Sequence, residues 1–168
     1  YEHKYEYCDL LITGSGPSGL ASAYAAAKNG ARVILAEDKS RFGGTLLTSE
    51  VNIGNKSGKE WADGIISELK EMPNVTVKNR SQVFGYYDHN MLVMSERVSD
   101  HLPETKEFHP KQRLWYIRAK KVLISSGSIE RPIVFGNNDT PGVMLSSAAK
   151  EYMKVYGVLV GKNPLIFT

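Results

Sequence analysis

The hydrophobic positions near the start of the chain form short runs that alternate between the strand and helix patterns. An apolar run at Leu10–Ile12 leads into a glycine-rich turn, and a small-residue stretch with five alanines follows from Leu20 to about Lys28. Gly30 suits the left-handed position that ends a helix, and a second apolar run, Val33–Leu35, comes next. Strand, helix and strand in this order predict a βαβ unit with parallel strands.

The rest of the pattern adds an antiparallel part to this parallel start. We expect, in order, a helix from a capping box at Ser57 to Pro73, a strand at 74–77, a hairpin of 86–87 and 91–94 around a turn at 88–90, a loose loop at 99–111, a third meander strand at 113–118, an apolar strand at 121–128, and a helix at about 147–156 closed by Gly157. Residues 1–7 show no clear period, so a linker from an upstream domain and a short lead-in both stay open.

These elements predict an α/β fold, a Rossmann-like FAD/NAD(P)-binding domain of the glutathione-reductase type with a parallel sheet and an antiparallel β-meander. We assign residues 1–160 to this domain. Residues 161–168 read as the first strand of a second nucleotide-binding unit, and a strand without a successor favours a piece of a longer protein.

The glycine turn Gly14–Gly19, with the sequence GSGPSG, is the main candidate site. Its first glycine permits a tight turn, its second lets the backbone approach a pyrophosphate, and its third lets helix and strand pack closely. The helix that follows offers free N–H groups and a positive dipole to that pyrophosphate. Glu37 lies 37 − 19 = 18 positions past the last glycine, where an acid can bind both ribose hydroxyls.

Further candidates follow the acid and the later strands. Gly43–Gly44 gives backbone freedom for a turn close to a ligand, although a plain surface turn is an alternative, and Arg41 suits either a phosphate or solvent. Val83 lies at the point in the sequence where folds of this type direct their third strand towards the adenine, so we expect it to contact the adenine. The small residues Ser125–Gly127 leave room for a nucleotide. The candidate cofactor-binding residues are Gly14, Ser15, Gly16, Pro17, Ser18, Gly19, Glu37, Asp38, Lys39, Arg41, Gly43, Gly44, Thr45, Val83, Ser125, Ser126 and Gly127.

Composition excludes several other classes of protein. The 168 residues are 42% hydrophobic and 23% charged, as in an ordinary globular domain, and a net charge of +3 without basic runs disfavours nucleic acid. The single cysteine fits a reducing compartment, and the four histidines are too dispersed for a metal site. Without a signal peptide or an apolar span we expect a cytoplasmic protein without membrane contact. No side chains form a candidate catalytic set.

Several stretches carry a resemblance to a known family: the GSGPSG turn, the RFGG pair, RLWYIRAKKVLISSGSIERP, NNDTPGVM and the closing GKNPLIFT. From about Tyr7 to Thr168 the chain resembles the alpha subunit of heterotetrameric sarcosine oxidase, and more widely the alpha subunits of dye-linked proline dehydrogenases and hydrogen cyanide synthase. The glycine motif is common to many flavoproteins, whereas IERP with NNDTPGVM is more particular. Ser125-Ser126-Gly127 stands where relatives more usually have Ala-Thr-Gly.

The resemblance implies a large alpha subunit that works with beta, gamma and delta subunits. Such complexes oxidatively demethylate a small-molecule substrate, sarcosine, to glycine, with tetrahydrofolate and oxygen as acceptors. It implies NAD in the nucleotide site of this chain, with FAD as the alternative, and FAD and a covalent FMN elsewhere in the complex. Two other functions stay open. One is the FAD-binding half of an NAD(P)H-dependent reductase, which the missing CxxC and second glycine motif disfavour; the other is an interaction module with a structural nucleotide.

Overall fold

A single six-stranded sheet organises the chain, with strand order β5-β2-β1-β8-β7-β6. The computed structural model describes residues 2–104 and 108–167. The parallel strands are β1 (Glu2–Thr13), β2 (Val33–Ala36), β5 (Val75–Lys78) and β8 (Gln112–Ile124), and β6 (Ser81–Tyr87) and β7 (Met91–Arg97) complete an antiparallel meander with β8. The helices are α1 (Pro17–Lys28), α2 (Gly58–Glu71) and α3 (Ser146–Tyr156), with 3-10 turns η1 (Gly44–Leu47) and η2 (Asp88–Asn90) and a two-stranded ribbon of β3 (Asn52–Ile53) and β4 (Lys56–Ser57). The predicted parallel sheet with a meander is confirmed.

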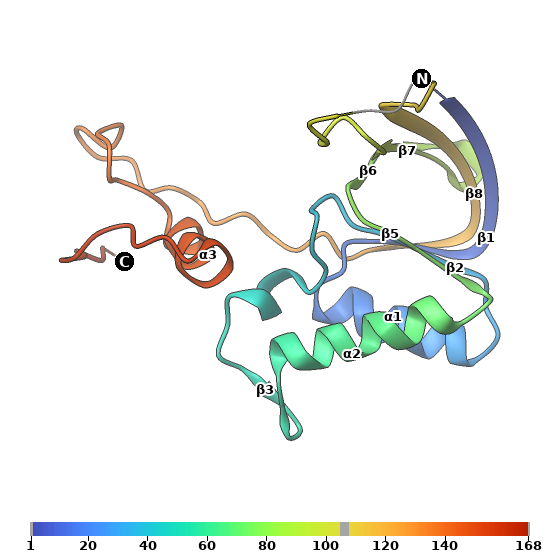
Figure 1. The fold of residues 1–168 in the computed structure, drawn as a ribbon, viewed down its shortest axis with the longest axis horizontal. Coiled ribbons are helices and arrows are strands. Elements are labelled where there is room, and N and C mark those ends of the chain that lie inside the picture. Colours follow the sequence, from blue (N-terminus) through green and yellow to red (C-terminus); the bar gives the residue numbers. More distant parts are fainter. Residues whose placement is uncertain (1, 105–107, 168) are drawn as a thin grey trace.

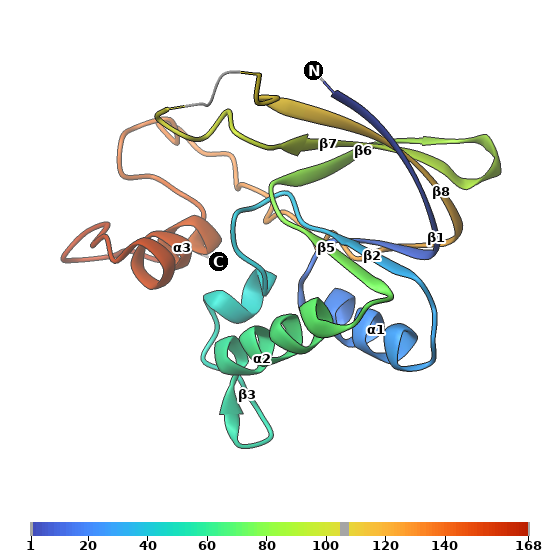
Figure 2. The ribbon, with the colours of Figure 1, turned by 45° about the vertical axis from the view of Figure 1, so that its right-hand side comes forward.

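The two longest strands, β1 and β8, join the parallel part of the sheet to the meander. They pair in parallel from Glu2 opposite Arg113 to Thr13 opposite Ile124, and both curve along their length (Figure 2). The prediction of separate strands at 113–118 and 121–128 is wrong, because β8 is one continuous strand. It continues through Ala119, which is buried, and Lys120, whose ammonium group forms an ion pair with the Asp9 carboxylate. Residues 3–7 of β1 are all exposed, which explains why the sequence there shows no period.

The curved sheet has a core on each of its faces. On one face, Leu20 of α1 and Leu69 of α2 pack against Ile12, and Figure 1 shows both helices on the same side of the parallel strands. On the other face, Leu11 and Cys8 pack against residues of the meander. Neighbouring residues of a strand point to opposite faces, so a strand buried on both sides reads as a continuous apolar run.

Local signals in the sequence fix the helix ends. The capping box at Ser57 is present: its hydroxyl accepts a hydrogen bond from the Glu60 amide, and the Glu60 carboxylate accepts one from the Ser57 amide at 2.9 Å. Helix α1 starts at Pro17, three residues earlier than expected. Proline suits the first helical position because its fixed φ is already helical and the missing N–H would have no partner there.

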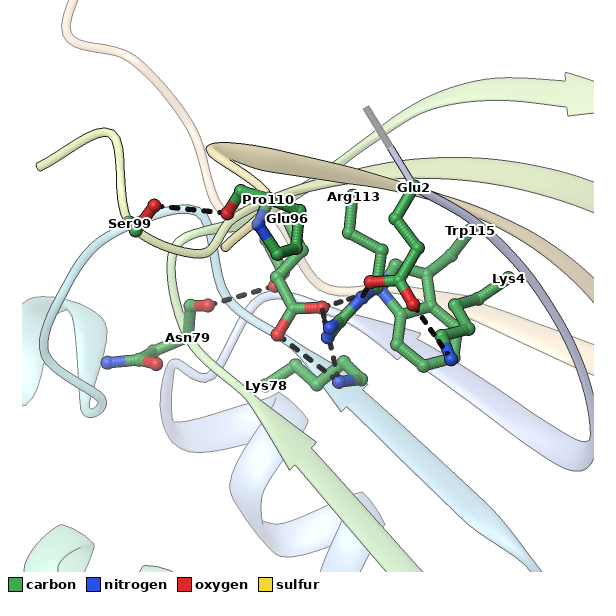
Figure 3. A network of polar contacts seen from close by, with 10 residues as sticks. Glu2, Lys4, Lys78, Asn79, Glu96, Ser99, Pro110, Arg113 and Trp115 are labelled. Atoms are coloured by element: carbon green, nitrogen blue, oxygen red, sulfur yellow. Dashed lines mark hydrogen bonds and ion pairs between the residues drawn. The ribbon is translucent and has the colours of Figure 1, made fainter. Parts of the chain in front are cut away.

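A network centred on Glu96 joins the end of β5 to the meander (Figure 3). The Glu96 carboxylate accepts hydrogen bonds from Trp115 Nε1 at 2.6 Å, Arg113 Nη1 at 3.2 Å and Lys78 Nζ at 3.3 Å. The carbonyl of Lys78 accepts a hydrogen bond from the Glu37 amide at 2.9 Å. The network therefore fixes the strand that lies next to the candidate acid of the site.

The segment after β8 leaves the sheet and carries α3 beside the loop that follows β2 (Figure 1). The predicted helix is confirmed, although none of its residues is buried. Residues 161–167 form neither helix nor strand, so their assignment to a second nucleotide-binding unit stays a prediction. Residues 105–107 of the expected loop and Thr168 of the expected last strand lie outside the described residues. Within the described part of the chain, no helix has the length and apolarity that crossing a membrane requires.

Candidate dinucleotide-binding site

The glycine turn follows the end of β1 and lies against the end of β8. Gly14 has φ 95, a backbone conformation that favours glycine, and its amide donates to the Ala36 carbonyl of β2 at 2.8 Å. A Cβ atom at Gly14 would lie 2.4 Å from the Ser125 carbonyl oxygen. The first glycine is therefore required by both its dihedral angles and its contact with Ser125, the residue that follows β8.

Gly19 is required for close packing, as the motif predicts. A Cβ atom there would lie 2.0 Å from the Gly14 carbonyl oxygen and 2.8 Å from Ser125 Oγ. The Ser125 hydroxyl lies within hydrogen-bond distance of the Thr13 and Gly14 carbonyl oxygens, at 2.9 and 3.0 Å, and fills the corner between the two strands. Ser126 and Gly127 are exposed and lead away from the turn.

The open side of the turn lies at Gly16. This residue is the N-cap of α1, and a Cβ atom built on it meets nothing within 4 Å. Pro17 and Ser18 are exposed beside it. The first-turn amides of a helix have no intrahelical acceptors, and no acidic side chain in the first turn of α1 competes for them. These features fit the pyrophosphate of a dinucleotide, which needs free N–H donors and close approach to the backbone.

Glu37 lies beside the turn with both carboxylate oxygens already bonded. Oε2 accepts hydrogen bonds from the Ser15 amide at 2.9 Å and from the Ser15 hydroxyl, and Oε1 accepts one from the Lys39 amide at 3.0 Å. Burial raises the pKa of the Glu37 carboxyl, the neighbouring Asp38 carboxyl raises it further, and the Ser15 and Lys39 donors act in the opposite direction. The acid is thus placed next to the glycine turn, with part of its acceptor capacity used by the protein.

The Gly43–Gly44 turn packs directly on the glycine turn, so two motifs far apart in the sequence form one wall. The Gly43 amide donates to the Ser15 carbonyl at 3.1 Å, and a Cβ atom on Gly44 would lie 2.9 Å from Gly16 Cα. Thr45 follows, exposed, in η1.

Two candidate cofactor-binding residues with cationic side chains, Lys39 and Arg41, contact α3. Lys39 Nζ pairs with the Glu151 carboxylate at 2.9 Å, and Arg41 Nη1 donates to the Val155 carbonyl at 3.3 Å. Asp38 is exposed, and its carbonyl accepts a hydrogen bond from Arg97 at 2.9 Å. The sequence did not predict that α3 lies beside this loop, because the contacts between them join residues more than a hundred positions apart.

Val83 lies on β6 of the meander. Its side chain packs against the core that β1 shares with the meander, and the pairing of β6 with β7 is irregular between Val83 and Gly85. A role for Val83 at the adenine stays a prediction.

Comparison with known proteins defines the class to which this fold and site belong. Residues 9–106, more than half of the chain, match the FAD dependent oxidoreductase family, and the chain belongs to that family. Over all 168 residues it is 46% identical to sarcosine oxidase subunit alpha of Rhizobium meliloti (strain 1021). The chain spans about a sixth of that relative, 17% of its length.

Solved structures show the same fold. L-proline dehydrogenase from P. horikoshii superposes with a TM-score of 0.76 at 24% identity, over 96% of this chain and 31% of that one. The flavoprotein disulfide reductase RclA from Escherichia coli superposes with a TM-score of 0.54 at 21% identity, over 82% of this chain and 32% of that one. These likenesses support the predicted flavoprotein architecture.

Proposed function

We propose that the glycine turn, Glu37 and the Gly43–Gly44 turn bind the ADP half of an adenine dinucleotide. The observation that carries this proposal is the open space at Gly16 in front of the α1 N-terminus, where a methyl group would meet nothing within 4 Å. Flanking residues are packed so tightly that Gly14 and Gly19 tolerate no side chain. An open backbone at one position within a close-packed turn is what a bound pyrophosphate requires.

The dinucleotide in this proposal is NAD, on the strength of the resemblance to sarcosine oxidase alpha subunits. The family match favours FAD and makes it the alternative. The residues brought together here face the ADP portion that both molecules share. When bound, the nicotinamide or flavin supplies the redox chemistry, and the side chains of this chain bind and orient the other half.

The chain is, in this proposal, the nucleotide-binding part of the alpha subunit of a cytoplasmic complex with beta, gamma and delta subunits. The complex demethylates sarcosine oxidatively to glycine, with tetrahydrofolate and oxygen, and carries FAD and FMN outside this chain. Residues 1–160 form the nucleotide-binding domain and residues 161–168 begin a second unit. The 46% identity to a sarcosine oxidase alpha subunit supports this assignment. The second candidate is the FAD-binding half of an NAD(P)H-dependent reductase or of another amine or proline dehydrogenase, favoured by the family match alone.

The test is to identify the nucleotide that the full-length protein releases on denaturation, by mass spectrometry. We expect NAD in near-stoichiometric amount. Release of FAD from this chain would favour the second candidate. A protein that holds no nucleotide, and binds neither NAD nor FAD when each is added, would overturn the proposal.

A further inference from the structure

The side chain of Ser15 connects three separate segments of the candidate site. It is fully buried, and its hydroxyl donates a hydrogen bond to Glu37 Oε2. The same hydroxyl accepts a hydrogen bond from the Gly43 amide at 3.3 Å. The second position of the glycine turn is thus joined through one oxygen atom to the acid after β2 and to the Gly43–Gly44 turn.

These contacts determine which oxygen of Glu37 is free for a ligand. A carboxylate offers about four acceptor positions. Oε2 uses two of them for the amide and hydroxyl of Ser15, and Oε1 uses one for the Lys39 amide. About one position is left, on Oε1. The sequence suggested an acid that binds both ribose hydroxyls, whereas this geometry leaves room for one strong hydrogen bond.

We propose that Ser15 is a positioning residue for nucleotide recognition: its hydroxyl holds Oε2 of Glu37 against the glycine turn, so that Oε1 accepts a single hydroxyl of the adenosine ribose. The proposal rests on the proposed function, because it assumes that an ADP moiety lies at the turn. In this proposal Ser15, a residue of the glycine motif, positions Glu37, a role that the spacing of the motif does not predict.

The electrostatic surroundings of Glu37 provide a readout that separates positioning from simple packing. Burial raises the pKa of this carboxyl, and the Ser15 hydroxyl counteracts the effect. Charged groups near Glu37 include Asp38, whose carboxyl also raises the pKa of Glu37, and Lys39, which is paired to Glu151 of α3. Arg97 of β7 donates a hydrogen bond to the Asp38 carbonyl, and Lys78 of β5 is paired to Glu96. None of these pairs involves Ser15. Loss of its hydroxyl therefore acts on Glu37 directly, and moves the protonation of that carboxyl to higher pH.

The test compares Ser15→Ala with Ser81→Ala in the full-length protein from which bound nucleotide has been removed. Ser81 is a matched control: it is buried, and its hydroxyl lies 2.9 Å from a carbonyl oxygen, that of Asn79. Calorimetry measures affinity for ADP, the portion common to NAD and FAD, from mildly acidic to mildly basic pH. Loss of a hydrogen bond to a charged group predicts roughly tenfold weaker binding by Ser15→Ala at neutral pH. For Ser15→Ala, the pH below which binding weakens moves to a higher value. For Ser81→Ala, the dependence of affinity on pH is the same as that of the wild type.

A double-mutant cycle with Glu37→Gln adds a second measurement that does not depend on equal stability of the variants. We expect Ser15→Ala to cost much less affinity in the Glu37→Gln background. Two results would overturn the inference: a Ser15→Ala profile parallel to that of the wild type, or effects of the two substitutions that simply add. If the wild-type protein binds no ADP, NAD or FAD at any pH, the proposed function itself is wrong and the role of Ser15 falls with it.

Discussion

Replacing Gly16 by alanine separates the binding role of the glycine turn from its folding role. Gly16 has φ −66 and ψ −177, which alanine adopts without strain, and the added methyl group meets nothing within 4 Å. Reduced freedom of the unfolded chain stabilises such a variant by about 0.4–1 kcal/mol. Alanine is a poorer N-cap than glycine by a similar amount, about 0.5–1 kcal/mol. The two effects offset, so we expect the melting temperature to stay within a few degrees of the wild type.

Binding by the same variant should fall sharply. The methyl group would occupy the space in which we place the pyrophosphate, and loss of close approach weakens the contacts of the phosphate oxygens with the α1 amides. We expect at least a tenfold loss of dinucleotide affinity, equivalent to about 1.4 kcal/mol.

Gly19→Ala is the matched comparison, because it should damage folding first. Its Cβ atom would lie 2.0 Å from the Gly14 carbonyl oxygen, so α1 must move away from β1. Overpacking of this kind costs about 1–3 kcal/mol or more, against a gain of about 1 kcal/mol from better helix propensity. At the upper end of this range, a net loss of about 2 kcal/mol corresponds to a fall of roughly 4–8 °C in melting temperature for a domain of this size.

Thermal melting by circular dichroism and calorimetric titration with NAD or FAD give the two readouts for both variants. A Gly16→Ala protein that melts well below the wild type, or one that binds as tightly as the wild type, would contradict the role of Gly16 in binding rather than folding.

Four further outcomes follow from individual contacts and surfaces. Ser57→Ala removes the acceptor for the Glu60 amide, so we expect a loss of about 1 kcal/mol in urea unfolding, and an unchanged midpoint would contradict this capping role. The hydrogen bonds from Lys120 and the Arg32 amide lower the pKa of Asp9 from 3.8 to about 2. The ionised Asp9 carboxylate therefore stabilises the fold fully above the higher pKa, and this stabilisation is lost as pH falls towards the lower one. Asp9→Asn should make acid unfolding less steep in this pH range. The isolated 168-residue chain exposes Tyr152 and many other apolar side chains after β8, so the molar mass measured by light scattering should increase with concentration. It should produce no peroxide from sarcosine unless a beta-like partner is added, and steady turnover alone would contradict the proposed division of labour.

The sequence was informative where a local pattern had one structural solution. The βαβ unit, the capping box at Ser57 and the helix closed by Gly157 each depend on residues within a few positions of one another, and the structure has all three. The fold class followed from the order of these elements. Gly14 and Gly19 could be assigned because their tasks, a positive φ and close packing, allow no other residue.

Features that depend on distant partners could not be predicted. Residues 2–7 form half of a long strand only because β8 runs beside them, and the side chains of residues 3–7 are too exposed to show a period. Lys39 and Arg41 were candidate cofactor-binding residues, but their ion pair and hydrogen bond to α3 could not be foreseen, because they depend on where the chain returns more than a hundred residues later. The Ser15 hydroxyl had no sequence signal at all, because a small residue at that position is compatible with many contacts.

The central claim, that Glu37 faces the adenosine ribose, is tested most directly by comparing NAD with NADP on nucleotide-free protein. A 2′-phosphate would place negative charge next to the buried carboxylate of Glu37, and two like charges about 4 Å apart near a protein surface repel by roughly 4 kcal/mol. We therefore predict that NAD binds at least tenfold more tightly than NADP in the same calorimetric experiment. Equal affinities would contradict the placement of Glu37 at the ribose and, with it, the account of this site.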